Sequence, residues 1–234
     1  MENRGALIVI EGVDRCGKTT QCKKLVEKLK ENNIKAEFIH FPDRTTYTGK
    51  LINDYLSKNV ELSDQAIHLL FSANRWELEP FIKKKLLDGI NLIVDRYSFS
   101  GVAYSAAKQS NMDLDWFKNP EIGLPKPDCV LYLQLEQLVA NGREGFGEER
   151  YENNEFQKSV ALCFDKLKDE TWKVINANKT IEKLSEELYS IINERELPGG
   201  GAAQLYWDAS YTASSSVLKG YNDTVVKTTG PELD

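Results

Sequence analysis

A phosphate-binding pattern occupies residues 11–20, EGVDRCGKTT, directly after the apolar run ALIVI. The fixed positions of G-x-x-x-x-G-K-T are filled by Gly12, Gly17, Lys18 and Thr19. In loops of this kind, backbone N–H groups surround anionic oxygens, the lysine reaches the β- and γ-phosphates and the threonine hydroxyl binds Mg²⁺. A strand pattern precedes the loop and a helical pattern follows it, which is the context that this motif needs. These residues therefore predict a nucleotide phosphate site.

The middle of this loop carries three side chains that phosphate binding does not require: Asp14, Arg15 and Cys16. The nearby Lys18 and the start of a helix favour a thiolate at Cys16, which would make this cysteine reactive. An equally simple interpretation is that Cys16 is only small enough to fit. Cys22 lies on the apolar face of the following helix, so we expect it in the core.

Two further polar motifs follow predicted strands, VDRY at residues 94–97 and FPDR at residues 41–44. Ligands of open α/β sheets bind outside the carboxyl ends of the strands. Asp95 is therefore placed to hold Mg²⁺ through water, and Arg96 and Arg44 offer forked donors for phosphate groups. The alternatives are a surface ion pair in the first motif and a solvated arginine in the second.

The segment LLFSANRW, residues 69–76, places an aromatic ring and a guanidinium on one helical face, because Phe71 and Arg75 are four residues apart. Such a face could stack on a planar base and hydrogen-bond to its edge. A core phenylalanine beside a surface arginine explains the spacing equally well. Neither His40 nor His68 has the spacing of a metal ligand, so we interpret both as structural.

Two segments lack a periodic apolar pattern. Residues 141–151, NGREGFGEERY, hold three glycines among charged residues, which favours a mobile lid, although a plain surface loop has the same composition. From residue 197 the chain turns to a glycine run and the sequence SYTASSS. This change predicts a flexible tail over residues 197–234, in which residues 205–207 could dock on the domain.

The elements that must position the polar motifs alternate along the chain. Short apolar runs predict five buried strands, and periodic apolar residues predict helices between them. The strands are expected at residues 7–10, 37–41, 91–95, 129–133 and 172–175. Helices are expected after the glycine loop, around residues 51–56, from Ser63 towards Pro80, and around residues 156–167 and 181–191. This alternation predicts an α/β fold with a parallel sheet.

Composition limits the class of protein. The chain has 234 residues, of which 41% are hydrophobic and 28% charged, as expected for a soluble globular domain with a tail. The net charge of −6 argues against a nucleic-acid partner and against an anionic membrane. Four cysteines without a C-x-x-C pair favour reduced thiols inside the cell. We expect a cytoplasmic protein, with a nuclear or mitochondrial fraction left open.

Taken in order, EGVDRCGKTT, FPDR, LLFSANRW, DRYSFSGVAY, GLPKPD and FGEERYE resemble the motifs of eukaryotic thymidylate kinases, from about residue 5 to about residue 192. Enzymes of that family transfer a phosphoryl group from ATP to dTMP and so supply dTDP for dTTP synthesis. The resemblance implies a P-loop nucleotide kinase fold: a five-stranded parallel sheet flanked by helices, with a lid at about residues 136–153. It also implies Mg²⁺ as cofactor, ATP and dTMP as ligands, a homodimer, and a kinase domain over residues 1–196.

The resemblance further implies a role for each motif position. The catalytic residues would be Asp14, Arg15, Lys18 and Asp95. The ATP site would comprise Gly12, Arg15, Cys16, Gly17, Lys18, Thr19, Thr20, Arg143 and Lys179. The dTMP site would comprise Asp14, Phe41, Arg44, Phe71, Arg75, Arg96, Ser100, Gly101, Tyr104 and Tyr151. The metal site would comprise Thr19 and Asp95.

In this family's arrangement the charged residues of the loop have functions. Asp14 would hold the 3′-hydroxyl of the acceptor, and Arg15 would lie across the transferred phosphoryl group as an arginine finger supplied by the same chain. Phe71 would stack on thymine, Arg75 would donate to its O4 edge, and Tyr104 would crowd the 2′ position of the sugar.

Two features depart from the family pattern. Residues 198–234 replace the short leucine–tryptophan ending that is usual there, and a cysteine stands at position 16, where alanine is common. Two other functions compete with a dTMP kinase: a deoxynucleoside kinase and a catalytically silent nucleotide-binding regulator. Two arginines aimed at the acceptor phosphate argue against the first, and the intact Lys18, Asp95 and Arg15 argue against the second.

Overall fold

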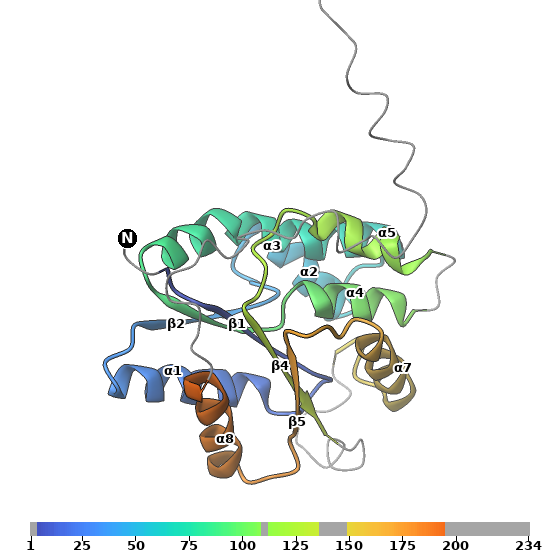
Figure 1. The fold of residues 1–234 in the computed structure, drawn as a ribbon. Helices are drawn as coiled ribbons and strands as arrows, with labels where there is room; N and C mark the ends of the chain where they lie inside the picture. Colours follow the sequence, from blue (N-terminus) through green and yellow to red (C-terminus); the bar gives the residue numbers. More distant parts are fainter. Residues whose placement is uncertain (1–3, 109–111, 136–148, 195–234) are drawn as a thin grey trace, which may run out of the picture.

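A five-stranded parallel sheet forms the centre of the structure, a computed structural model that describes residues 4–108, 112–135 and 149–194 (Figure 1). The strands are β1 (Leu7–Glu11), β2 (Ala36–His40), β3 (Asn91–Asp95), β4 (Cys129–Gln134) and β5 (Trp172–Asn176). They are ordered β2-β3-β1-β4-β5, so the strand before the phosphate loop is central. The pairing is parallel throughout, with Val9 beside Val94 on one side and Val130 on the other. The predicted fold class is therefore confirmed.

Helices cover both faces of this sheet. They are α1 (Lys18–Glu31), α2 (Tyr47–Leu56), α3 (Asp64–Leu87), α4 (Ser98–Ala106), α5 (Leu114–Lys118), the 3₁₀ turn η1 (Asn119–Glu121), α7 (Asn154–Asp165) and α8 (Ile181–Glu194). Helices α1 and α8 lie together on one face, and α3, α4 and α7 cover the other (Figure 1). This covering explains why the strands read as continuous apolar runs, since both of their faces are buried.

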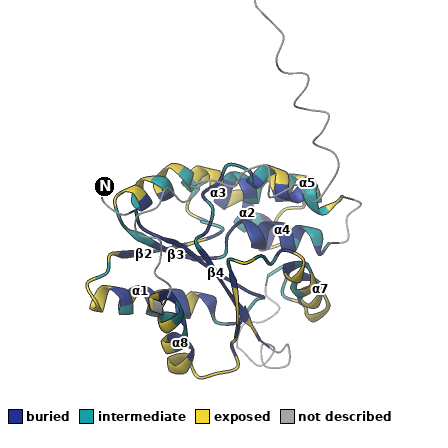
Figure 2. Cartoon of the chain, in the orientation of Figure 1, coloured by how far each residue is buried: buried dark blue, intermediate teal, exposed yellow. Residues whose placement is uncertain are grey.

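Alternation within each strand divides the interior into two cores. Leu7 and Val9 of β1 face the layer of α3, α4 and α7, whereas Ile8 and Ile10 face α1 and α8. Figure 2 shows the central strands buried and the outer faces of the helices exposed. Cys22 is fully buried in the second core, as its helical position predicted. The two cores hold the sheet rigid, so that the loops at its carboxyl edge have a fixed base.

The long helix α3 corrects one prediction. It was expected to end near Pro80, but it continues to Leu87 with the proline inside. Proline removes a helical hydrogen bond and usually ends or kinks a helix. Here Ile82 and Leu86, beyond the proline, are buried against the sheet, and this packing outweighs the loss. The short elements α4, α5 and η1 were not recognised from periodicity, because they are too brief or too uniformly buried to show it.

The carboxyl ends of β1, β2 and β3 carry the three polar motifs, as predicted. The phosphate loop follows β1, the segment with Arg44 follows β2, and Asp95 ends β3. Arg15 and Arg96 both have positive φ angles, 64° and 65°. This conformation is uncommon for residues with a side chain and is concentrated at functional sites.

Candidate active site

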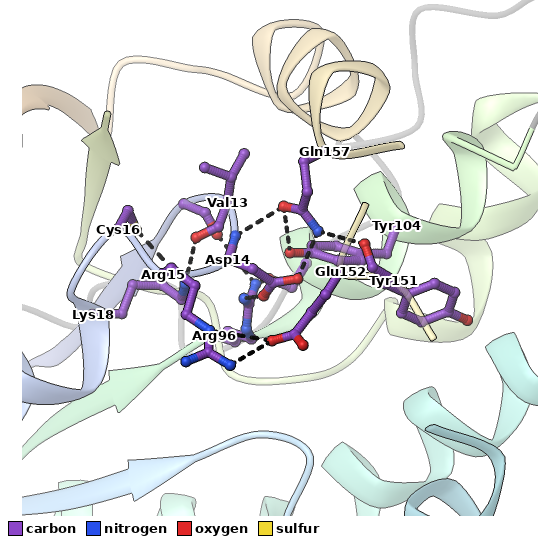
Figure 3. Close-up of polar contacts among 12 residues, drawn as sticks. Val13, Asp14, Arg15, Cys16, Lys18, Arg96, Tyr104, Tyr151, Glu152 and Gln157 are labelled. Atoms are coloured by element: carbon purple, nitrogen blue, oxygen red, sulfur yellow. Dashed lines mark hydrogen bonds and ion pairs between the residues drawn. The ribbon is translucent and has the colours of Figure 1, made fainter. Parts of the chain in front are cut away.

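The phosphate loop closes on itself around the lysine. Gly17 has a φ of 100° and caps the N-terminus of α1, a conformation that glycine adopts without strain. The Nζ atom of Lys18 is buried and donates to the carbonyl oxygen of Val13 at 2.7 Å (Figure 3). The loop therefore forms a ring of backbone at a helix N-terminus, which is an arrangement suited to anions.

Cys16 packs inside this ring. Its side chain is 1% exposed, and its sulfur lies 3.6 Å from the Nζ atom of Lys18. A Cβ atom added to Gly12 would come within 2.7 Å of this sulfur and of the Leu133 carbonyl oxygen. The geometry explains the need for glycine at position 12 and for a small residue at position 16. Whether the thiol is also reactive stays a prediction.

A carboxylate and a hydroxyl meet beside the loop. The Thr19 hydroxyl donates to Oδ2 of Asp95, which ends β3. The other oxygen, Oδ1, is buried and has no hydrogen-bond partner. The described residues include no cluster of three or more histidine, cysteine or acidic side chains that could enclose a metal ion. One free carboxylate oxygen beside a hydroxyl fits Mg²⁺, which is commonly held by one or two protein oxygens together with water and substrate phosphates.

A cavity of about 100 Å³ lies next to this loop. All ten residues that were assigned to the dTMP site line it: Asp14, Phe41, Arg44, Phe71, Arg75, Arg96, Ser100, Gly101, Tyr104 and Tyr151. These residues come from segments far apart in the sequence, so the fold brings together what the motifs predicted. Their individual roles stay predictions.

The pair of Asp14 and Arg96 joins the two cavities. Both residues line the cavity described above, which we call the acceptor cavity. They also line a second cavity, which lies beside Lys18 and Thr19. The Nη2 atom of Arg96 donates to Asp14 (Figure 3). Its Nη1 atom donates to the Gly12 carbonyl oxygen and to the Ser100 hydroxyl, each at 3.1 Å. Burial lowers the pKa of Arg96, but the surrounding negative charges raise it more, so its pKa is above the ordinary value. Arg96 is thus a permanent cation at the junction.

Glu11 supports this junction and was not recognised from the sequence. Its carboxylate is fully buried and accepts hydrogen bonds from the Tyr97 and Ser100 N–H groups at 2.9 and 3.1 Å, and from the Ser100 hydroxyl at 2.6 Å. Burial raises the pKa of Glu11 above its usual range. These bonds tie the end of β1 to the start of α4 and hold the turn that contains Arg96. A charged residue at the end of an otherwise apolar strand was the available signal.

Carboxylates from the segment before α7 face two arginines of the site. Arg15 donates to Oε1 of Glu152 from Nε and Nη2, at 3.2 and 2.9 Å. Arg44 forms an ion pair with Glu149 at 2.7 Å. The spacing of the glutamates gave no indication of either pairing, because both depend on how residues 149–152 fold over the cavity.

Gln157 of α7 connects the phosphate loop to the wall of the acceptor cavity and was also missed. Its Nε2 atom donates to Asp14 at 2.6 Å and to the Tyr151 carbonyl oxygen at 3.0 Å, and its Oε1 atom accepts from the Asp14 N–H at 2.9 Å (Figure 3). The side chain is fully buried. A polar residue on the buried face of an amphipathic helix was the only signal in the sequence.

Aromatic rings form one wall of the acceptor cavity. Tyr104 lies against Tyr151 with ring centroids 5.8 Å apart, and the guanidinium of Arg96 lies 5.0 Å above the Tyr104 ring. The Tyr104 hydroxyl is 3.5 Å from Oε1 of Gln157. Burial raises the pKa of the Tyr104 hydroxyl well above its usual range, so this ring is neutral.

The far end of the cavity holds the predicted base-recognition pair. Phe71 is half-buried and lines the cavity, which removes the interpretation of this ring as ordinary core alone. Arg75 is 2% exposed, so the alternative of a surface arginine is wrong. Its partner is Glu121 of η1, a residue without any recognisable sequence signal. Nearby, His68 is fully buried between Ser105 and the Phe117 carbonyl oxygen, which agrees with a structural role.

Several predicted features are not part of the two cavities or fall outside the described residues. Lys179 pairs with Glu187 and lines neither cavity. Arg143 and most of the expected lid, residues 136–148, lie outside the described residues, as does the tail over residues 197–234. The domain boundaries therefore stay predictions.

Comparison with known proteins agrees with this geometry. The family model described as thymidylate kinase matches residues 10–188. The thymidylate kinase of Danio rerio is 52% identical over 202 residues, covering 82% of this chain and 95% of the relative, and that of Homo sapiens is 53% identical over 188 residues, covering 79% and 88%. The solved thymidylate kinase of Candida albicans is 42% identical with a TM-score of 0.78, and the match covers 84% of this chain and 94% of that structure. The family model spans most of the chain, and these relatives are identical to the chain at about half of the aligned positions. The chain therefore belongs to the thymidylate kinase family.

Proposed function

We propose that this chain transfers the γ-phosphoryl group of ATP to dTMP and so forms dTDP and ADP. One observation carries the proposal: two cavities share Asp14 and Arg96, and one of them is bounded by the phosphate loop, while the other combines aromatic walls with arginines. A donor bound on the first side and an acceptor bound on the second meet at the shared pair. The chain is an enzyme of the kinase class, as its family membership implies.

Lys18 and the backbone of the loop bind the β- and γ-phosphates of ATP in this proposal. Arg15 belongs to the phosphate loop and its side chain is 31% exposed, so it can turn from Glu152 towards the transferred group. Arg96 and Arg44 bind the phosphate of dTMP, and Asp14 accepts a hydrogen bond from the 3′-hydroxyl. Holding the two substrates in line supplies most of the catalysis, because phosphoryl transfer needs little covalent chemistry from the protein.

Thr19 and Asp95 are the residues that would hold Mg²⁺. The unpartnered Oδ1 atom of Asp95 supports this assignment, because a buried carboxylate oxygen without a donor is costly unless a ligand satisfies it. When bound, Mg²⁺ neutralises charge on the β- and γ-phosphates. The bond between the γ-phosphorus and the β,γ-bridging oxygen then breaks, and an oxygen of the dTMP phosphate forms the new bond.

A coupled assay of ADP release tests the proposal. Purified chain with ATP and Mg²⁺ is supplied with dTMP, thymidine, AMP or UMP in parallel. We expect rapid ADP release with dTMP, and with the other three acceptors rates at least tenfold lower, because thymidine leaves two guanidinium groups without phosphate and the other nucleotides differ in base or sugar. Binding of ATP without ADP release in the presence of dTMP would contradict the proposal, and a preference for thymidine would identify a nucleoside kinase.

The protein is also proposed to act as a homodimer without nucleic acid or membrane partners. Helices α2 and α3 carry the exposed apolar side chains Leu51, Leu69, Trp76 and Phe81, which a second copy would cover. Within the described residues, no helix has the length and apolar character needed to cross a membrane. Sedimentation equilibrium would measure the assembly, and a monomer at micromolar concentration would argue against the dimer.

A further inference from the structure

A buried ion pair holds one of the residues that line the proposed base pocket, Arg75. Arg75 donates from Nε to Oε2 of Glu121 at 2.7 Å and from Nη2 to Oε1 of the same carboxylate. The two side chains are 3% and 2% exposed. A carboxylate held along one edge of a guanidinium fixes its plane as well as its position. Glu121 therefore determines which way Arg75 faces.

Glu121 leaves one edge of the Arg75 guanidinium uncovered, at the Nη1 atom. Arg75 lines the acceptor cavity, and among the described residues its Nη1 atom forms no hydrogen bond. Gly101 lies against the same end of the group, since an added Cβ atom would come 2.5 Å from Nη2 and 3.0 Å from Nη1. The absence of a side chain at position 101 leaves room for the guanidinium in this orientation.

The turn that carries Glu121 is itself anchored to α3. Its neighbour Pro120 accepts hydrogen bonds at its carbonyl oxygen from the Ser72 hydroxyl at 3.0 Å and from Nε1 of Trp76 at 2.8 Å. Residues 72, 75 and 76 share one helical face, so three side chains hold η1 against α3. Glu121 consequently approaches Arg75 from a fixed direction.

Glu121 also neutralises the charge of Arg75. An unpaired arginine at the end of a buried cavity would attract an anion, whereas a neutralised one presents only directed N–H donors. Such donors match a neutral ring that carries a carbonyl oxygen. They oppose a ring with an amino group at the same place, because two donors would then face each other.

From this geometry we infer that Glu121 is a positioning residue for base selection: it orients and neutralises Arg75 so that the acceptor site accepts pyrimidines with a 4-oxo group and rejects those with a 4-amino group. This inference rests on the proposed function, in which dTMP occupies the cavity. It concerns the choice of base and leaves the transfer chemistry to other residues.

Three acceptors separate the effect on the base from other effects. Both dTMP and dUMP carry the 4-oxo group, and they differ only in the 5-methyl group, whereas dCMP carries a 4-amino group. For Glu121→Gln we expect the KM for dTMP to rise about tenfold with a smaller change in kcat, because one hydrogen bond to the arginine and its counter-charge are lost. The ratio of kcat/KM for dTMP and dUMP should stay within about twofold, while the preference for dTMP over dCMP should fall about tenfold.

Two comparisons control for a purely structural effect. Glu121→Asp keeps the charge, and we expect it to restore most of the preference for dTMP over dCMP. Asp128→Asn removes the carboxylate of another largely buried ion pair, with Arg4, that lies far from the cavity. We expect Asp128→Asn to lower the unfolding temperature without changing any acceptor ratio. An unchanged KM and an unchanged dTMP to dCMP ratio in folded Glu121→Gln would overturn the inference, and so would an equal loss for all three acceptors.

A double variant decides the matter if Glu121→Gln does not fold. In Arg75→Met/Glu121→Met both charges leave together, so none is buried without a partner. Because Glu121 is inferred to act through Arg75, the kcat/KM of the double variant for dTMP should be within about threefold of the value for Arg75→Met alone. A further loss of tenfold or more would show that Glu121 acts independently and would overturn the inference. Absence of dTMP phosphorylation in the unsubstituted chain would instead contradict the proposed function.

Discussion

The two cavities of the site are built in different ways. The donor side is formed by one continuous segment, the phosphate loop with the start of α1, completed by Asp95 from β3. The acceptor side is assembled from residues of five regions, which extend from the phosphate loop to the segment before α7. The donor side includes the N-terminus of α1, whereas the acceptor side depends on side chains that hold one another through ion pairs and hydrogen bonds.

This difference predicts how each side responds to substitution of its residues. Backbone N–H groups at a helix N-terminus keep their direction when a neighbouring side chain changes. A side chain held by a buried carboxylate loses its direction when that partner is removed. We therefore expect donor-side substitutions to act on the chemistry itself, and acceptor-side substitutions to spread from binding to selectivity and stability.

Arg15→Ala should produce the largest effect and would test the donor side. Arginine fingers contribute about a thousandfold or more to phosphoryl transfer, so kcat should fall by at least that factor while the affinity for ATP changes little. Steady-state kinetics and ATP titration measure the two quantities. The exposed Lys23 on α1 provides a matched control, since Lys23→Ala should leave both unchanged. Near-normal kcat would assign the role to Arg143 or Arg150, although Arg150 is held by Glu61 at 2.7 Å.

Arg96→Ala and Arg44→Ala would compare a residue that lines both cavities with a more exposed residue of the acceptor cavity. Arg96 touches both cavities and is largely buried, so its loss should lower kcat/KM for dTMP about a hundredfold through both kcat and KM. Arg44 is 39% exposed and lines only the acceptor cavity, so its loss should raise KM about tenfold with little change in kcat. Equal effects from the two substitutions would remove the distinction between them.

A pH effect on stability is expected from the acceptor side. Burial, followed by the charge of Arg75, lowers the pKa of His68 to about 4 from its ordinary 6.5. Between these values the unfolded chain binds a proton that the folded chain does not bind, so stability falls as the pH falls. The loss between pH 7 and pH 5 should be about 2 kcal/mol in the free energy of unfolding.

Urea unfolding at the two pH values measures this effect. His68→Gln should remove about 2 kcal/mol of the pH dependence, whereas the exposed His40→Gln should leave it in place. A pH dependence that is identical in wild type and His68→Gln would show that another group is responsible.

Tyr104→Ala should have the smallest effect and would test sugar selection. The ring fills the cavity wall between Arg96 and Tyr151, so its removal should make room for a 2′-hydroxyl. We expect the preference for dTMP over its ribose counterpart to narrow about tenfold, and Tyr104→Phe to retain it, because the ring rather than the hydroxyl excludes the ribose. Equal preference ratios in wild type and Tyr104→Ala would exclude Tyr104 from sugar selection.

The sequence predicted the sheet and the donor side well, for a physical reason. Buried parallel strands require continuous apolar runs, and a phosphate loop requires glycines and a lysine at set spacing, so both leave local patterns. Glu121, Gln157 and Glu11 leave no such pattern, because Arg75, Asp14 and Tyr97, to which they respectively bond, are 46 to 143 residues away. The continuation of α3 beyond Pro80 was missed because tertiary packing overrides a local preference. Long-range polar pairing is what local pattern reading does not detect.

In the acceptor cavity, carboxylates of the protein and the phosphate of the substrate compete for the same arginines. Glu149 and Asp14 already neutralise Arg44 and Arg96 before any phosphate arrives. An incoming phosphate therefore replaces carboxylates, and the net gain in attraction is smaller than two bare guanidinium groups would provide. On the way out the same carboxylates compete for the arginines and help to expel dTDP, which carries more charge than dTMP. Such a site favours turnover over retention of its product.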